Sequence, residues 1–340
     1  MSRRPEGALP ADARREQLEN WLREDAGIAV DRIDVASADA SFRRYFRVWL
    51  PGGTAIAMDA PPEHEDCRPF VHVAGLLRDA GLHAPEILAR DLDEGFLLLS
   101  DLGNRTYLDV IDAGNADALF TDALEALVRW QCASRPGELP EYDAALLQRE
   151  LDLFPDWYVS RHLGLEFEDD ERRIWSDICE RLLESALEQP RVFVHRDYMP
   201  RNLMVSDPNP GIIDFQDAVF GPIAYDVVSL FRDAFVSWEE PRERYWLLDY
   251  WQRARAAGLP VTSDYDEFLR AVDWMGLQRH LKVLGIFARL NYRDGKSGYL
   301  GELPRFQHYV KSVAGRYEAL RPLADLVSAL LQRAVGVGAG

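Results

Sequence analysis

Four residues of this 340-residue chain have types and spacing that could perform chemistry. His195, Asp197 and Asn202 follow the apolar run VFV in the spacing H-x-D-x4-N, and Asp214 follows a second apolar run, GII. Both runs are short and contain β-branched or aromatic residues. Each run therefore reads as a buried strand that ends in polar side chains.

These residues suit phosphoryl transfer, in which a protein holds Mg²⁺ on the phosphates and orients the attacking hydroxyl group. Asp197 would accept the proton of that hydroxyl, and His195 would brace the loop with a backbone hydrogen bond. Asn202 and Asp214 would hold the metal through hard oxygen ligands. The alternative is a polar loop with a core histidine and a capping aspartate. The order of strand, polar loop, strand and acid favours a kinase that uses ATP and Mg²⁺.

The composition argues against several classes of protein. A net charge of −18 is unfavourable for binding nucleic acid or an anionic membrane surface. No apolar run reaches the length of a membrane span, and the N-terminus lacks the apolar core of a secretory signal. The three cysteines lie far apart and have no metal-binding spacing. We expect a cytoplasmic protein, a monomer that acts on a small molecule.

The elements that must position these residues change in character along the chain. We expect strands over 33–36, 42–50, 54–59, 86–89 and 96–100, and helices over 11–24 and 67–80. Later helices are expected over 115–132, 144–162 and 169–188. The pattern thus predicts a strand-rich nucleotide-binding domain over 1–100 and a helical domain over 101–340 that carries the catalytic loop and the acceptor site.

The seam between two lobes is the default position for a ligand. In a two-lobed kinase the exposed backbone of such a hinge binds adenine, and Leu99 and Asp101 are the candidates here. The alternative is a simple linker between domains.

Three motifs resemble those of the aminoglycoside phosphotransferase and choline kinase branch of the protein-kinase-like fold. They are VHRDYMPRNLM at 194–204, IIDFQD at 212–217 and GPIAYD at 221–226. The resemblance covers nearly the whole chain and implies an α+β, bilobal fold with a small antiparallel sheet lobe and a larger, mostly helical lobe. It also implies that Asp226 ties down the catalytic loop through backbone N–H groups. An aspartate early in a helix is also an ordinary partner of the helix dipole.

Further motifs resemble the cytoplasmic anomeric kinases of N-acetylmuramate and N-acetylglucosamine. They include MDAPP at 58–62, GFLLLSDLG at 95–103 and LFRDAF at 230–235. Such enzymes phosphorylate the C1 hydroxyl of the sugar in bacterial cell-wall recycling, so the resemblance implies a sugar kinase. Two alternatives stay open: a kinase for a cationic acceptor such as an aminoglycoside or choline, and a pseudokinase that only binds nucleotide.

One position departs from the kinase pattern. Where kinases carry a phosphate-binding lysine on the third strand, this chain has Met58. Arg43 or Arg44 could supply the missing charge, because a guanidinium group grips phosphate in a fork. Ser41 could add a hydroxyl from the loop 36–41, which should cover the phosphates. The alternative is that the arginines are solvated residues of an alternating strand.

The acceptor is expected beside the proposed base, where aromatic faces and planar polar groups could bind a sugar. The candidates are Trp157, Tyr158, Arg232 and Asp233. The alternatives are that the aromatic residues fill the core and that Arg232 forms an ordinary salt bridge.

Overall fold

The computed structural model describes residues 12–38 and 42–337, and the chain divides into two compact units. The first unit comprises residues 1–104 and 204–217, and the second comprises 105–203 and 218–340. The segment 204–217 therefore belongs with the strand-rich part of the chain, although it follows the loop of Asp197 in sequence. This return of the chain is not part of the sequence-based prediction.

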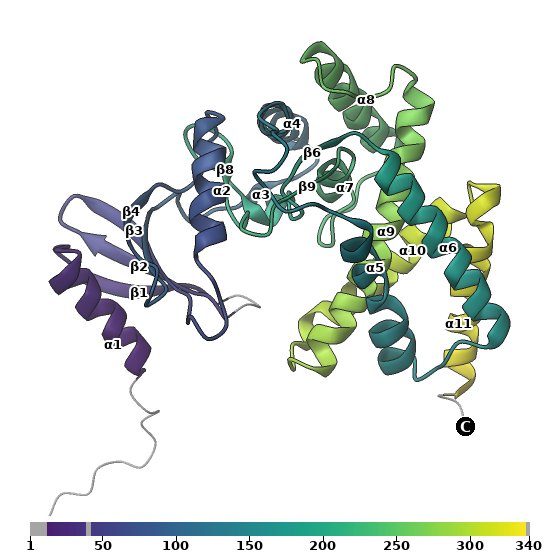
Figure 1. Cartoon of the computed structure of the whole chain (residues 1–340), viewed down its shortest axis with the longest axis horizontal. Helices are drawn as coiled ribbons and strands as arrows, with labels where there is room; N and C mark the ends of the chain where they lie inside the picture. The colour runs from purple at the N-terminus through teal and green to yellow at the C-terminus, as the bar shows by residue number, and fades with distance from the viewer. Residues whose placement is uncertain (1–11, 39–41, 338–340) are drawn as a thin grey trace, which may run out of the picture. The chain divides into compact units, whose positions relative to one another are not determined.

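Five antiparallel strands form the sheet of the first unit, in the order β1-β2-β3-β5-β4 (Figure 1). The strands are β1 (Arg32–Ala38), β2 (Arg44–Leu50), β3 (Gly53–Asp59), β4 (Ile87–Asp91) and β5 (Phe96–Ser100). A tight turn joins β2 to β3, and Leu50 lies opposite Gly53 in this hairpin. The hairpin predicted from the Pro-Gly-Gly sequence is confirmed.

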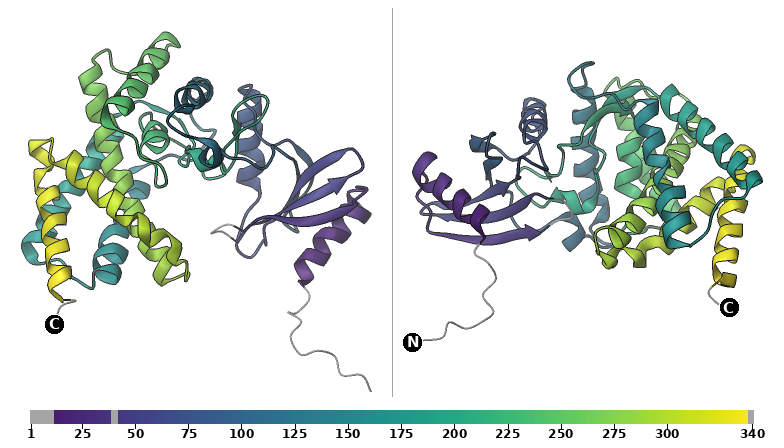
Figure 2. Two further views of the ribbon diagram at one scale, coloured as in Figure 1. Left: turned by 180° about the vertical axis from the view of Figure 1, so that it is seen from behind. Right: turned by 60° about the horizontal axis from the view of Figure 1, so that its bottom comes forward.

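The core of the first unit lies between the sheet and its first helix, α1 (Ala13–Asn20), which continues as the π-helical turn η1 (Trp21–Asp25). Leu18 and Trp21 bury their side chains against strand residues such as Phe46. Figure 2 shows α1 lying along the sheet.

A second helix of the first unit, α2 (Arg68–Asp79), packs against the returning segment. The ring of Phe70 lies 4.7 Å from the ring of Phe215. This segment also contains the short strand β8 (Gly211–Ile212), which pairs with β7 (Leu203–Met204). The contact with α2 therefore fixes the residue that directly follows Asp214.

The second unit is mostly helical. Its helices are α3 (Tyr107–Val110), α4 (Ala116–Cys132), α5 (Ala144–Leu151), η2 (Phe154–His162), α6 (Asp169–Glu188), η3 (Pro200–Asn202), α7 (Tyr225–Phe231), α8 (Glu240–Ala256), α9 (Tyr265–Tyr292), η4 (Ser297–Glu302), α10 (Leu303–Ala314), η5 (Glu318–Leu320) and α11 (Arg321–Val337). Two strands, β6 (Arg191–Val194) and β9 (Val219–Pro222), pair in antiparallel orientation.

Helix α9 runs through the core of the second unit, with α6 and α10 packed beside it (Figures 1 and 2). Its residues Leu277 and Leu281 belong to the same buried cluster as Phe154 of η2. Gly285 allows this close approach, because a Cβ atom there would lie 2.3 Å from the backbone oxygen of Leu153. Within the described ranges, no helix is long and apolar enough to span a membrane.

The predicted single helix over 144–162 is wrong. The α-helix α5 ends at Leu151, and the π-helical η2 begins at Phe154. Pro155 explains the break, because proline lacks a backbone N–H and its ring clashes with the carbonyl group one turn earlier.

Candidate functional site

The loop that carries Asp197 begins at the end of β6. The strand residues Val192, Phe193 and Val194 are buried, and Val194 lies opposite Val219 of β9. Apolar burial therefore holds the strand in place, His195 after it is still buried, and Arg196 and Asp197 are the first partly exposed residues.

Asp226, in the first turn of α7, binds the backbone of this loop. The N–H groups of His195 and Arg196 donate to its two carboxylate oxygens at 2.7 and 2.9 Å. These are the bonds that the family resemblance implies. Complete burial raises the pKa of Asp226 to about 7, although the two backbone donors act in the opposite direction.

Within the loop, two local hydrogen bonds hold the backbone of Asp197. The N–H of Asp197 donates to Nδ1 of His195 at 3.3 Å, which is the bracing contact expected of this buried histidine. Nδ2 of Asn202 donates to the backbone oxygen of Asp197 at 2.9 Å. The amide of Asn202 is therefore held against the loop, and its Oδ1 is the atom that would bind a metal ion.

Asp214 lies in the first unit, two residues after the end of β8. Its φ angle is +62°, a left-handed backbone conformation that is strained for a residue other than glycine. Buried Phe215 holds the chain on one side, and Nε2 of Gln216 donates to Oδ1 of Asp214 at 3.0 Å. Strained conformations of this kind are common at functional sites.

Each of the two residues predicted to bind magnesium has side-chain chemistry that suits this ion. Asn202 and Asp214 offer amide and carboxylate oxygens, which are hard ligands. In the part of the chain that the structure describes, no group of three or more His, Cys, Asp or Glu side chains could hold a metal by itself. Mg²⁺ is commonly held by one or two carboxylates together with substrate phosphates, so a small protein contribution fits this ion.

The arginines predicted to bind phosphate all have acidic partners in the first unit. Arg43 pairs with Glu65 at 2.7 Å, and Arg44 pairs with Asp59 at 2.5 Å. These carboxylates already compensate part of the charge of each arginine, and the phosphate-binding role stays a prediction. Met58 is completely buried, and Ser41 lies outside the described residues.

The predicted adenine-binding residues differ in their surroundings. Leu99 is buried and lies inside the sheet, opposite Ile56 of β3 and Ile87 of β4. Asp101 follows the end of β5 and pairs with Arg47 at 2.7 Å. Burial alone would raise the pKa of Asp101, but hydrogen bonds from Arg47 and from the Gly103 N–H outweigh it and lower that pKa.

The predicted acceptor residues are largely occupied by contacts within the second unit. Tyr158 is completely buried and accepts a hydrogen bond from Gln307 at 2.8 Å, whereas Trp157 is partly exposed. Arg232 is buried and pairs with Glu243 at 2.7 Å and with Asp273 at 2.6 Å. These contacts correspond to the alternatives, a core aromatic residue and an internal salt bridge. A substrate role for either residue stays a prediction.

Asp233 is different, because one of its oxygens lacks a partner. Its Oδ1 accepts the N–H of Ala234 at 2.6 Å, while the buried Oδ2 has no hydrogen-bond partner among the described residues. Burial raises the pKa of Asp233, and its role in sugar binding stays a prediction.

Among the buried charged residues that sequence reasoning missed are Glu150 and Lys282. A signal was present for the first. Glu150 stands three residues after Leu147 and one before Leu151, on the apolar face of its helix. A charge at such a position must find a partner when the helix packs.

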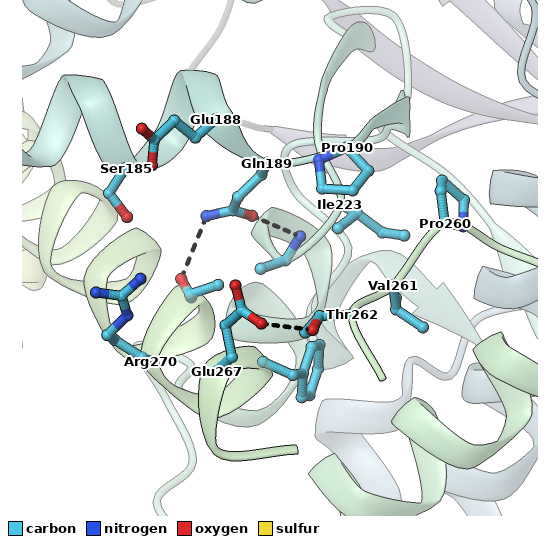
Figure 3. A pocket seen from close by; sticks show the side chains of 13 residues that line it. Ser185, Glu188, Gln189, Pro190, Ile223, Pro260, Val261, Thr262, Glu267 and Arg270 are labelled. Atoms are coloured by element: carbon cyan, nitrogen blue, oxygen red, sulfur yellow. Dashed lines mark hydrogen bonds between the residues drawn. The ribbon is translucent and has the colours of Figure 1, made fainter. Parts of the chain in front are cut away.

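A cavity of about 400 Å³ lies elsewhere in the second unit (Figure 3). Gln189 crosses it and accepts the Ala224 N–H while donating to the Ala271 oxygen, both at 3.3 Å. None of the predicted site residues lines this cavity. Gln189 thereby bonds Ala224, the N-cap residue of α7, and α7 carries Asp226.

An antiparallel five-stranded sheet, a larger helical unit and an H-x-D-x4-N loop after a buried strand define the kinase-like class of phosphotransferases. The model of the phosphotransferase enzyme family matches residues 32–262. The chain belongs to this family.

Two relatives extend over nearly the whole chain. The N-acetylmuramate/N-acetylglucosamine kinase of Pseudomonas aeruginosa is 56% identical, over 95% of this chain and 98% of the relative. The N-acetylmuramate/N-acetylglucosamine kinase of Neisseria meningitidis is 46% identical, over 93% of this chain and 95% of the relative.

Solved structures of the same fold have little sequence in common with this chain. A choline kinase from Streptococcus pneumoniae superimposes with a TM-score of 0.63 at 14% identity, over 88% of this chain and 99% of that one. An ADP-bound aminoglycoside phosphotransferase gives a TM-score of 0.59 at 14% identity, over 94% and 99%. The predicted α+β, protein-kinase-like fold is confirmed.

Proposed function

We propose that this protein is an ATP-dependent kinase that phosphorylates the C1 hydroxyl of N-acetylmuramate, N-acetylglucosamine or both, in the recycling of cell-wall sugars. The observation that carries the proposal is 56% identity over 95% of the chain to a kinase named for these two sugars. ATP is the donor that kinases of the family use, and one of the structures of this fold contains ADP. A monomer and a cytoplasmic location stay predictions.

The roles in the reaction follow from the loop. Asp197 orients the C1 hydroxyl and accepts its proton as the oxygen attacks the γ-phosphorus of ATP. The bond from that phosphorus to the bridging oxygen breaks, and ADP leaves. An anomeric hydroxyl is more acidic than an ordinary alcohol, so the base can take the proton late. His195 and Asp226 hold the loop backbone while this happens.

Other predicted residues would bind the nucleotide and its metal ion. Asn202 and Asp214 would hold Mg²⁺, which neutralises charge on the phosphates when it is bound. Asp101 and Leu99 are the proposed hinge residues for adenine.

The sugar ligand is the second question. Arg232 has two acidic partners, so Asp233, with its unpartnered oxygen, is the better supported of the two neighbours as a sugar ligand.

A coupled assay of ADP release tests the proposal. N-acetylmuramate, N-acetylglucosamine, an aminoglycoside and choline would be compared at equal concentration with ATP and Mg²⁺. We expect turnover with one or both N-acetyl sugars and a sugar 1-phosphate as product. Turnover of only a cationic acceptor would overturn the proposal. Nucleotide binding without transfer to any acceptor would favour a pseudokinase.

A further inference from the structure

Two anchors hold the residues that precede Asp197. The first is the carboxylate of Asp226, which binds the backbone N–H groups of His195 and Arg196. The second is Glu150, whose Oε1 accepts a hydrogen bond from Nη2 of Arg196. One anchor therefore holds the main chain of the loop, and the other holds a side chain.

The second anchor is needed because Arg196 has an unfavourable backbone. Its φ angle is +75°, in the left-handed region, which is sterically unfavourable for a residue with a Cβ atom. Such a conformation persists only where the surroundings determine it. The ion pair with Glu150 is one of these determinants.

Glu150 is a buried carboxylate with four donors. Its Oε1 accepts from Arg196 and from Nζ of Lys282, the latter at 2.8 Å. Its Oε2 accepts from Nε2 of Gln278 at 3.0 Å and from the hydroxyl of Tyr142. Burial opposes the charged form, but Lys282 and Arg196 outweigh it and lower the pKa of Glu150 to about 2. The carboxylate is therefore ionised throughout the physiological range.

Lys282, on α9, connects the two anchors. Besides its bond to Glu150, its Nζ donates to the hydroxyl of Tyr225 at 3.0 Å. Tyr225 is the first residue of α7 and directly precedes Asp226. A single ammonium group thus joins the residue that holds the Arg196 side chain to the helix that holds the loop backbone.

The charges in this cluster also include the proposed base. Arg196 and Lys282 bring two positive charges to the single carboxylate of Glu150. Burial opposes the charge of both cations, but Glu150, with a smaller contribution from Asp197, outweighs it and raises the pKa of Arg196 and of Lys282. Both cations therefore interact electrostatically with Asp197. Displacing either one would change the electrostatic potential at the Asp197 carboxylate.

We propose that Lys282 is a positioning residue for phosphoryl transfer. By joining Glu150 to Tyr225, it fixes Arg196 and thereby the direction of Asp197. The inference rests on the function proposed above, because Asp197 must be the base. Its consequence is that loss of Lys282 lowers turnover, while the affinity for ATP is unchanged because the proposed adenine-binding residues lie in the first unit.

The test compares Lys282→Met with Lys282→Arg in the full-length protein. We expect Lys282→Met to lower kcat at least about tenfold, with the KM for ATP within about twofold of the wild type. Lys282→Arg should recover part of the lost kcat, because a guanidinium group can donate to Glu150 and Tyr225 together. Lys311→Met, which changes an exposed lysine of α10, is the matched control and should behave as the wild type.

A double-mutant cycle separates positioning from general destabilisation. If Lys282 acts through Glu150, the variant Glu150→Gln/Lys282→Met should lose no more kcat than the worse single variant. Tyr225→Phe removes only a hydroxyl and serves if Lys282→Met does not fold, and we expect it to lower kcat about threefold to tenfold.

Three results would overturn the inference: unchanged kcat in Lys282→Met, unchanged kcat in Tyr225→Phe, or additive losses in the double variant. Failure of the proposed function would look different, since the wild-type protein would then turn over neither N-acetyl sugar.

Discussion

Replacing Asp226 with asparagine (D226N) should impair turnover far more than folding. The carboxylate accepts two backbone N–H groups, at 2.7 and 2.9 Å. Asparagine keeps one acceptor oxygen and turns an NH₂ donor towards the other N–H, so one bond is lost. A hydrogen bond to a charged group contributes about 1.5–3 kcal/mol. If the transition state loses this much stabilisation because Asp197 is held less well, kcat decreases by a factor of about 10 to about 150.

The effect on stability should be smaller, because Asp226 is completely buried and asparagine removes a desolvated charge. The assay is kcat with N-acetylglucosamine and saturating ATP, together with unfolding in urea for each variant. Asp177→Asn, at an exposed position of α6, is the matched control. A D226N kcat within about threefold of the wild type would refute the reasoning, because the loop would then not depend on this carboxylate.

The same residue predicts opposite pH dependences for activity and stability. Burial raises the pKa of Asp226 from 3.8 to about 7. The ionised form of Asp226 holds the loop, so kcat should fall as pH decreases through about 7. This decrease on the acidic side of the pH profile should be absent from D226N. Because folding raises the pKa, the neutral form favours the folded state. This contribution to stability is therefore fully present below pH 3.8 and is lost as pH rises through about 7. An identical acid limb in D226N would contradict the assignment.

Two further predictions concern packing and nucleotide binding. Gly285→Ala places a Cβ atom 2.3 Å from the backbone oxygen of Leu153 and should lower the free energy of unfolding by about 1–3 kcal/mol, measured in urea. Gly75→Ala, where nothing lies within 4 Å, should instead raise it by about 0.5–1 kcal/mol, and equal effects would contradict the packing argument. Arg47→Gln removes both side-chain bonds to Asp101 and should raise the KM for ATP about threefold to tenfold with little change in kcat. An unchanged KM would show that this ion pair does not support the hinge.

Regular periodicity made most elements predictable from the sequence. Helix α6 begins at Asp169 and ends at Glu188, as its apolar pattern indicates, and the β2–β3 hairpin follows from its turn residues. Pro155 also marks the break between α5 and η2 in the sequence, because a proline inside a helical pattern ends or kinks the helix, but the apolar periodicity continues across it.

Contacts between distant segments could not be predicted in this way. The partners of Arg43 and Arg44 depend on which acids the fold brings to the start of β2, and no local pattern specifies that. The pair of Glu150 and Lys282 joins two helices far apart in the chain. For the loop itself, the role of Asp226 was implied by the resemblance of the GPIAYD motif to a family motif, and the carboxylate does accept the two backbone N–H groups.

The most direct test of the central claim is the turnover of N-acetylglucosamine and N-acetylmuramate by Asp197→Asn at saturating ATP and Mg²⁺. The substitution preserves the shape of the side chain and removes the proton acceptor. We predict a loss of kcat of about 10²–10⁴-fold with a nearly unchanged KM for ATP. A variant that retains kcat within about threefold of the wild type would contradict the claim that Asp197 is the base for phosphoryl transfer.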